Sequence, residues 1–197
     1  MCSVKMANKK TIALDMEQYK QIIKIIQEGF EFDDVKIRSN IRIATILVLQ
    51  ANLGLRIGDI LNLKLKDITK DGDRYRLNII EQKTLKDRTF TVPLEVYNYI
   101  KLYTLENNIK ITAKIFPISV RAVQKHLKLV CSYLKLENIS THSFRKYFAT
   151  QIYINNDYNI TLVKTLLQHS NITTTQRYIG ISSSEIESAL KNHIQLL

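Results

Sequence analysis

Two histidines, an arginine and a late tyrosine occur within residues 141–180 at intervals that suit a single phosphate. His142 and Arg145 are three positions apart, so both would point to one side of a helix. His169 and Tyr178 follow further along the chain. Imidazole and guanidinium groups bind phosphate oxygens, and a phenol can attack phosphorus. The pattern predicts strand cleavage through a covalent tyrosyl phosphate, with no metal ligand set required.

Each of these residues also has an ordinary structural explanation when it is taken alone. A lone histidine is usually a hydrogen-bonded surface or core group, and Tyr178 is one of 10 tyrosines. The prediction therefore depends on the joint pattern. A metal-dependent nuclease is a weak alternative, because His142 and His169 have no carboxylate neighbours at ligand spacing.

The elements that must position these residues are predicted to be mostly helical. Apolar residues recur at helical spacing through most of the chain, which has only 5 glycines and 2 prolines. Caps and breakers delimit helices near residues 16–28, 37–53, 57–63, 93–105, 119–136, 141–154, 160–168, 172–179 and 182–197.

Residues 66–92 change to a period of two. Asp71-Gly72-Asp73 forms a turn between the first two alternating runs, so we expect a small antiparallel sheet of three strands. The predicted fold class is mainly α with this small three-stranded antiparallel β-sheet. The second turn carries Lys83, Lys86 and Arg88, and is either a solvated hairpin tip or a contact to a DNA backbone.

Arg56 lies between the helix stop at Gly54 and another short apolar helix. Taken alone, it is best explained as a structural ion pair, with Asp59 as a candidate partner. Its place beside a buried helix favours a functional role, because a charge so close to a core normally has a partner or a task.

The composition favours a soluble protein that binds a polyanion. The 197 residues carry 29 Lys and Arg against 18 Asp and Glu, a net charge of +11. Two cysteines give no disulfide framework, so we expect the reducing cytoplasm, and no apolar run is long enough to span a membrane. We expect residues 1–10 to be a basic tail or the remnant of a linker, and residues 11–197 to form one domain.

Five short blocks follow one another along the chain. They are Gly54–Asp59, Lys83 in the second turn of the sheet, His142–Thr150, Leu167–Ile172 and Thr174–Tyr178. Together they resemble the catalytic domain of the tyrosine recombinases, the lambda-integrase type of phage and transposon integrases. The resemblance covers nearly the whole chain. The resemblance implies the fold of that catalytic domain. It also implies that the protein is a site-specific recombinase that acts on double-stranded DNA without cofactor, metal or ATP.

The resemblance also implies roles for the residues that form the site. Tyr178 would be the nucleophile that leaves a 3′-phosphotyrosine and a free 5′-hydroxyl. Arg56 and Arg145 would bind the non-bridging oxygens, and His169 would donate a further hydrogen bond to them. Lys83 would protonate the leaving 5′-oxygen.

Further residues would support this chemistry. His142 would assist in deprotonating the phenol, and Asp59 would orient Arg56 or His142. Additional DNA contacts are expected from four basic residues, Lys86, Arg88, Lys146 and Arg177. Two positions depart from the family pattern: Gln168 replaces a usual glycine, and Lys146 replaces a frequent histidine.

Family members commonly carry an N-terminal helical domain that clamps the other face of the DNA, and here only a short basic tail precedes the first helix. We therefore expect either a catalytic fragment or a minimal recombinase. Residues 182–197 are expected to dock on a neighbouring protomer in a DNA-bound tetramer, or simply to pack on their own domain. Alternative functions are a catalytically silent DNA-binding regulator and relaxation of supercoils like that by type IB topoisomerases.

Overall fold

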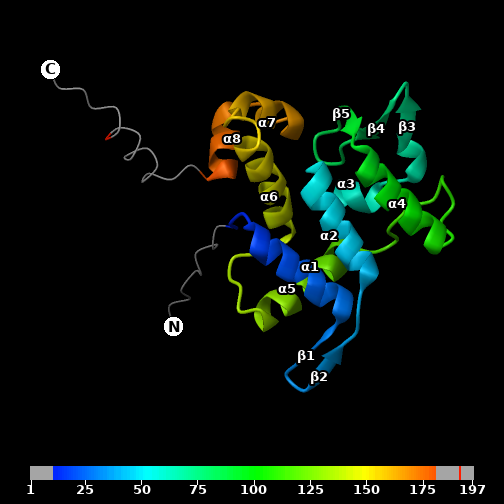
Figure 1. Cartoon of the computed structure of the whole chain (residues 1–197), viewed down its shortest axis with the longest axis vertical. Coiled ribbons are helices and arrows are strands. Elements are labelled where there is room, and N and C mark those ends of the chain that lie inside the picture. The colour runs from blue at the N-terminus through cyan, green and yellow to red at the C-terminus, as the bar shows by residue number, and fades with distance from the viewer. Residues whose placement is uncertain (1–10, 181–190, 192–197) are drawn as a thin grey trace, which may run out of the picture. The chain divides into compact units, whose positions relative to one another are not determined.

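The computed structural model describes residues 11–180 and Lys191 (Figure 1). The chain divides into two compact units, Met1–Phe148 and Ala149–Leu197. The expected class, mainly helical with a three-stranded antiparallel sheet, is confirmed. The predicted helix at 182–197 lies outside the described residues. None of the described helices is long and apolar enough to cross a membrane.

The elements of the first unit follow one another in this order: α1 (Met16–Glu28), β1 (Phe30–Phe32), β2 (Val35–Ile37), α2 (Ile41–Leu53), α3 (Ile57–Asn62), a 3-10 turn at Leu65–Asp67, β3 (Ile68–Asp71), β4 (Arg74–Ile80), β5 (Asp87–Val92), α4 (Leu94–Glu106) and α5 (Val120–Tyr133). Helix α6 (Thr141–Ile154) begins in the first unit and ends in the second, which also holds α7 (Ile160–Leu167) and α8 (Ile172–Ile179).

Helix α2 is the core helix of the first unit. Nine of its 13 residues are buried, so most of its surface is covered by the rest of the first unit. Asn40 caps its start by accepting a hydrogen bond from the Ile43 amide (3.1 Å). Gly54 ends it with a left-handed backbone (φ 59°). Figure 1 shows α1 and α3 close to this helix.

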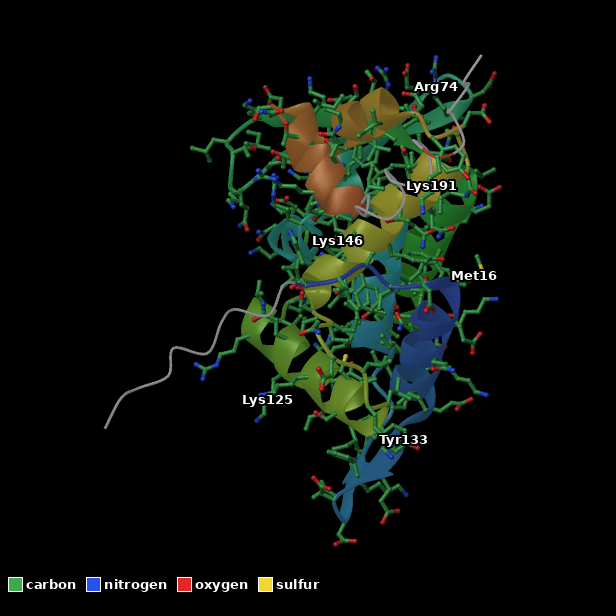
Figure 2. All side chains as sticks on the ribbon, turned by 90° about the vertical axis from the view of Figure 1, so that its left-hand side faces the viewer. Met16, Arg74, Lys125, Tyr133, Lys146 and Lys191 are labelled. Atoms are coloured by element: carbon green, nitrogen blue, oxygen red, sulfur yellow. The ribbon has the colours of Figure 1, made fainter. Side chains whose placement is uncertain are left out.

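The predicted start of α2 at residue 37 was wrong. Residues 30–37 instead form a short hairpin in which Phe30 pairs with Ile37. Its turn residues, Asp33 and Asp34, both have positive φ, a conformation that aspartate tolerates better than most residues. Tyr133, at the end of α5, packs on Phe30 with ring centroids 4.8 Å apart (Figure 2).

The three strands expected in residues 66–92 form one sheet with the order β3-β4-β5. Asp71 pairs with Arg74 across the first turn, and Ile80 pairs with Asp87 across the second. Ile68, Leu77 and Val92 are buried, so one face of the sheet packs on the core. The second turn, residues 81–86, extends from this sheet.

Two features of Gly54 lead us to expect that its replacement destabilises the fold. A Cβ atom at Gly54 would lie 2.3 Å from the Phe148 ring, and the left-handed backbone adds strain for any other residue. We predict that Gly54→Ala lowers the free energy of unfolding in urea by roughly 2–4 kcal/mol.

Gly72→Ala is the matched control, because Gly72 has a similar φ of 61° but no atom within 4 Å of the added Cβ. Gly72→Ala should lose only the part of the free energy of unfolding that is due to backbone strain. Equal losses for the two variants would contradict the proposed clash with Phe148.

Candidate active site

The backbone that leads into Arg56 is held by three buried side chains. The orphan carbonyls at the end of a helix need donors. Three consecutive carbonyls find one each: Leu53 from Arg88 Nη2 (3.4 Å), Gly54 from Arg145 Nη1 (2.8 Å) and Leu55 from Gln50 Nε2 (3.3 Å). Arg56 follows directly and begins α3. Its position is therefore fixed by contacts that come from three different elements.

The guanidinium of Arg56 forms an ion pair with Glu81, not with Asp59. The Glu81 side chain is fully buried, and its second oxygen accepts a hydrogen bond from Arg88 Nη1 (2.9 Å). The Thr84 hydroxyl donates to the oxygen that Arg56 binds (2.9 Å). One carboxylate thus joins the start of α3, strand β5 and the turn that carries Lys83.

Two opposing effects act on the Glu81 carboxyl. Burial favours the neutral acid, but hydrogen bonds from Thr84, Arg56 and Arg88 outweigh it, and the pKa of Glu81 is lowered. Glu81 is therefore ionised at neutral pH, and its charge is balanced by two guanidinium groups.

Asp59, on α3, is also buried but has a different role from the expected one. Its Oδ1 atom accepts a hydrogen bond from the backbone amide of Gln82 (2.9 Å), next to Lys83. Burial raises the pKa of Asp59, and the charge of Glu81 adds to this effect. The direct contact made by Asp59 therefore fixes the backbone beside Lys83, while Arg56 and Arg145 act on it through their charges.

Arg145 is placed by the first turn of α6. The Ser140 hydroxyl accepts a hydrogen bond from the His142 amide (3.2 Å), so Ser140 caps the start of the helix. Arg145 is 1% exposed and reaches Gly54, which places it beside the backbone of Arg56.

His142 lies on the exposed side of the same helix turn. Neighbouring protein atoms partly desolvate its ring and, with the charges of Arg145, Lys146, Arg56 and Lys83, lower the pKa of His142. The imidazole is therefore mainly neutral at pH 7. His142 is therefore close enough to Arg145, Lys146, Arg56 and Lys83 for their charges to act on it.

Two of the expected DNA contacts need correction. Arg88 is 2% exposed, because it neutralises Glu81 and supports Leu53 from inside the protein. Lys146 is 9% exposed and donates a hydrogen bond to the Thr11 carbonyl (2.6 Å) (Figure 2). Both lysines of the turn, Lys83 and Lys86, are exposed as expected.

The second unit brings His169 and Tyr178 together. Their rings meet edge to face with centroids 5.1 Å apart. The hydroxyl of Thr175, a buried residue on α8, bonds His169 Nδ1 (3.1 Å) and so fixes the orientation of the ring. Arg177 is exposed on the same helix. Thr175 was missed as a site residue, although its spacing of three from Tyr178 places both on one helix face.

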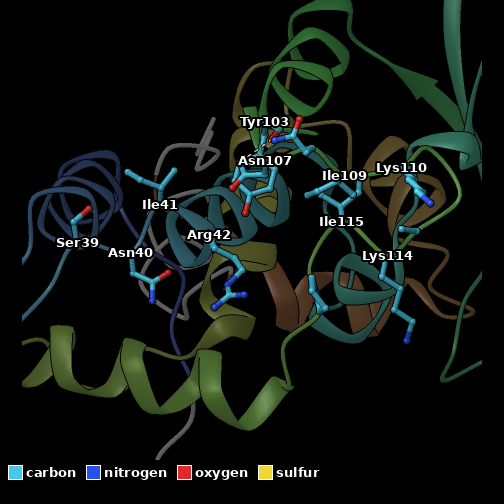
Figure 3. A pocket seen from close by; sticks show the side chains of 13 residues that line it. Ser39, Asn40, Ile41, Arg42, Tyr103, Asn107, Ile109, Lys110, Lys114 and Ile115 are labelled. Carbon is cyan, nitrogen blue, oxygen red and sulfur yellow. Dashed lines mark hydrogen bonds between the residues drawn. The ribbon is translucent and has the colours of Figure 1, made fainter. Parts of the chain in front are cut away.

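A cavity of about 680 Å³ lies elsewhere in the first unit (Figure 3). Arg42, Lys110 and Lys114 are among the residues that line it, but no predicted site residue of this unit is. Within residues 11–180 and at Lys191, no three His, Cys, Asp or Glu side chains form a set that could hold a metal ion.

We predict that Glu81→Gln removes a pH-dependent part of the stability. Because the pKa of Glu81 is lowered by folding, its contribution is present above the unfolded value, about 4.5, and is lost as the pH falls below it. The variant should be about 3–5 kcal/mol less stable at pH 7, since the buried Arg88 and the partly buried Arg56 lose their anion. Its unfolding free energy should also decline less below pH 4.5 than that of the wild type.

Urea denaturation between pH 7 and pH 3 measures both effects. Asp71→Asn is the control, because Asp71 forms an exposed ion pair with Arg76 (3.2 Å) and should contribute no more than about 1 kcal/mol. A Glu81→Gln protein as stable as Asp71→Asn at pH 7 would contradict the role of the buried ion pairs.

Gln168 ends α7 with a left-handed backbone, φ 53°, where the family usually has glycine. We predict that Gln168→Gly raises the free energy of unfolding by up to about 1 kcal/mol, because glycine adopts this conformation without strain. Thermal denaturation is a suitable measurement. A lower stability would show that the contacts of the Gln168 side chain outweigh the backbone strain.

Comparison with known proteins identifies the family and the fold of the chain. Residues 13–185 match the phage integrase family. The "Probable integrase/recombinase YoeC" of Bacillus subtilis is 30% identical over 87% of this chain and 95% of its own length. Tyrosine recombinase XerC of Caldanaerobacter subterraneus is 27% identical over 97% of this chain, which spans only 53% of XerC.

A solved structure shows the same fold. The XerH site-specific recombinase, bound to its palindromic difH substrate, superposes with a TM-score of 0.66 at 20% identity, over 93% of this chain and 53% of XerH. The expected fold is confirmed by this match. The chain belongs to the phage integrase family and has the catalytic-domain fold of the tyrosine recombinases.

Proposed function

We propose that the chain cleaves and rejoins double-stranded DNA at specific sites through a 3′-phosphotyrosine on Tyr178. The observation that carries this proposal is the grouping of four residues in the first unit, Arg56, Lys83, His142 and Arg145. The names of two relatives, which describe them as recombinases, support the proposal. The proposal requires Tyr178 and His169 to meet the same phosphate as this group.

The reaction is a balanced exchange of one phosphodiester for another. The Tyr178 oxygen bonds to phosphorus, the bond from phosphorus to the 5′-oxygen breaks, and Lys83 gives a proton to that oxygen. The phenolic proton passes to His142. Because the energy of the phosphodiester is retained, reversal of the same steps joins a new strand without ATP.

The states of the side chains suit these steps. A free phenol keeps its proton to about pH 10, so an acceptor is needed at neutral pH. The pKa of His142 is lowered by partial burial and by nearby cations, so its imidazole is available as that acceptor. Arg56 and Arg145 bear fixed charge for the non-bridging oxygens, whose charge increases in the transition state.

The partner is proposed to be duplex DNA, since a structural relative is bound to its substrate and this chain has a net charge of +11. Exposed Lys86 and Arg177 would contact the DNA backbone. We further propose that four copies assemble on DNA in the cytoplasm, with residues 182–197 docking between protomers.

Covalent capture tests the function. The full chain is incubated with nicked duplexes of randomised sequence in excess EDTA, and adducts that survive SDS are resolved on a gel and their DNA is sequenced. The wild type should form an adduct with a defined sequence. Tyr178→Phe should bind the same duplex with unchanged affinity and form none, because only the attacking oxygen is lost.

Tyr158→Phe is the control, because Tyr158 is an exposed tyrosine of the same unit, 65% accessible. It should form adducts at the wild-type rate. An adduct in the Tyr178→Phe protein would mean that another residue is the nucleophile. No adduct from the wild type would instead favour a regulator without catalysis, and relaxation of supercoils without exchange between two sites would favour a topoisomerase.

A further inference from the structure

Glu81 has no proposed role in binding or cleaving DNA. Its carboxylate nevertheless contacts Arg56 and the turn that carries Lys83, and both have such a role. One oxygen binds Arg56, at the start of α3, and the hydroxyl of Thr84 from the turn that carries Lys83. The other binds Arg88 of β5, so the carboxylate is held from three sides. Its side chain is fully buried, which keeps water from competing for these bonds.

The backbone of Glu81 also closes the turn. Its amide donates to the Lys86 carbonyl (3.0 Å), and its carbonyl accepts from the Leu85 amide (2.8 Å). Lys83 therefore lies within a turn that begins at Glu81 and is closed by the hydrogen bonds of Glu81 with Leu85 and Lys86. The turn cannot move away from Arg56 without breaking bonds to this one residue.

We propose that Glu81 is a positioning residue for strand cleavage, and that its carboxylate holds Arg56 and the Lys83 turn in one fixed relation. The inference deepens the proposed function and rests on it. Arg56 binds Glu81 through one nitrogen, Nη1, and its side chain is 22% exposed. The other N–H groups of the guanidinium can therefore reach a phosphate. Lys83 then meets the leaving oxygen of that same phosphate.

The negative charge of Glu81 matters as much as its shape. Without it, Arg56 and Arg88 would face each other with no anion between them, and Arg56 would turn away. Glutamine keeps the size of the side chain but not its charge. Aspartate keeps the charge on a shorter stem, so Glu81→Asp should restore part of what Glu81→Gln loses.

The test compares two leaving groups on the duplex that the wild type selects. One nicked duplex has the normal 5′-oxygen at the scissile bond, and the other has a 5′-bridging sulfur. A thiolate leaves without a proton because thiol pKa values lie near 8.5, so the sulfur duplex does not need Lys83. Single-turnover cleavage is measured with saturating full-length protein.

Glu81→Gln should cleave the oxygen duplex about 10- to 100-fold more slowly than the wild type, the range for losing an outer partner of a functional group. Its loss on the sulfur duplex should be clearly smaller, as for Lys83→Ala. Thr84→Val removes the hydroxyl that donates a hydrogen bond to the same carboxylate, and Thr84 is exposed. This variant should show the same pattern more weakly. Asp71→Asn should cleave both duplexes at the wild-type rate.

The ratio of the two rates does not depend on how much of the variant is folded, since the same folded molecules cleave both duplexes. Equal losses on the two duplexes, or no loss in Glu81→Gln, would overturn the role of Glu81 while the wild type still forms its adduct. Failure of the wild type to form any adduct would instead overturn the proposed function.

Discussion

One buried carboxylate, that of Glu81, binds two arginines of the first unit, of which Arg88 is buried and Arg56 is partly buried. Removal of a charge from water is costly unless an opposite charge and hydrogen bonds replace the solvent. Glu81 supplies both to Arg56 and Arg88. The arrangement is a constraint on geometry more than a source of stability, because the same space filled with apolar groups could be equally stable.

This constraint extends along the chain to the groups that would meet DNA. Arg88, held by Glu81, supports the Leu53 carbonyl, while Arg145 and Gln50 support the next two. The end of α2 is thereby tied to β5 and α6. A rigid frame of this kind suits phosphoryl transfer, where catalysis depends on donors that are already in place when charge develops.

The sequence predicted most of the fold, because helix caps and the period of two in residues 66–92 are local signals. It missed the β1–β2 hairpin, whose turn residues, Asp33 and Asp34, are not the usual glycine or asparagine. The grouping of Arg56, His142 and Arg145 was predicted from the family resemblance. The partner of Arg56 was not, since Glu81 is 25 positions away and Asp59 was nearer in sequence. The burial of Arg88 and Lys146 depends likewise on tertiary contacts that no local pattern encodes.

The most direct test of the account is to identify the atom that joins protein to DNA. The wild-type adduct is digested with protease and nuclease, and the modified peptide is sequenced by mass spectrometry. We predict a nucleotide 3′-phosphate on the phenolic oxygen of Tyr178. Attachment to any other residue, or through a 5′-phosphate, would contradict it.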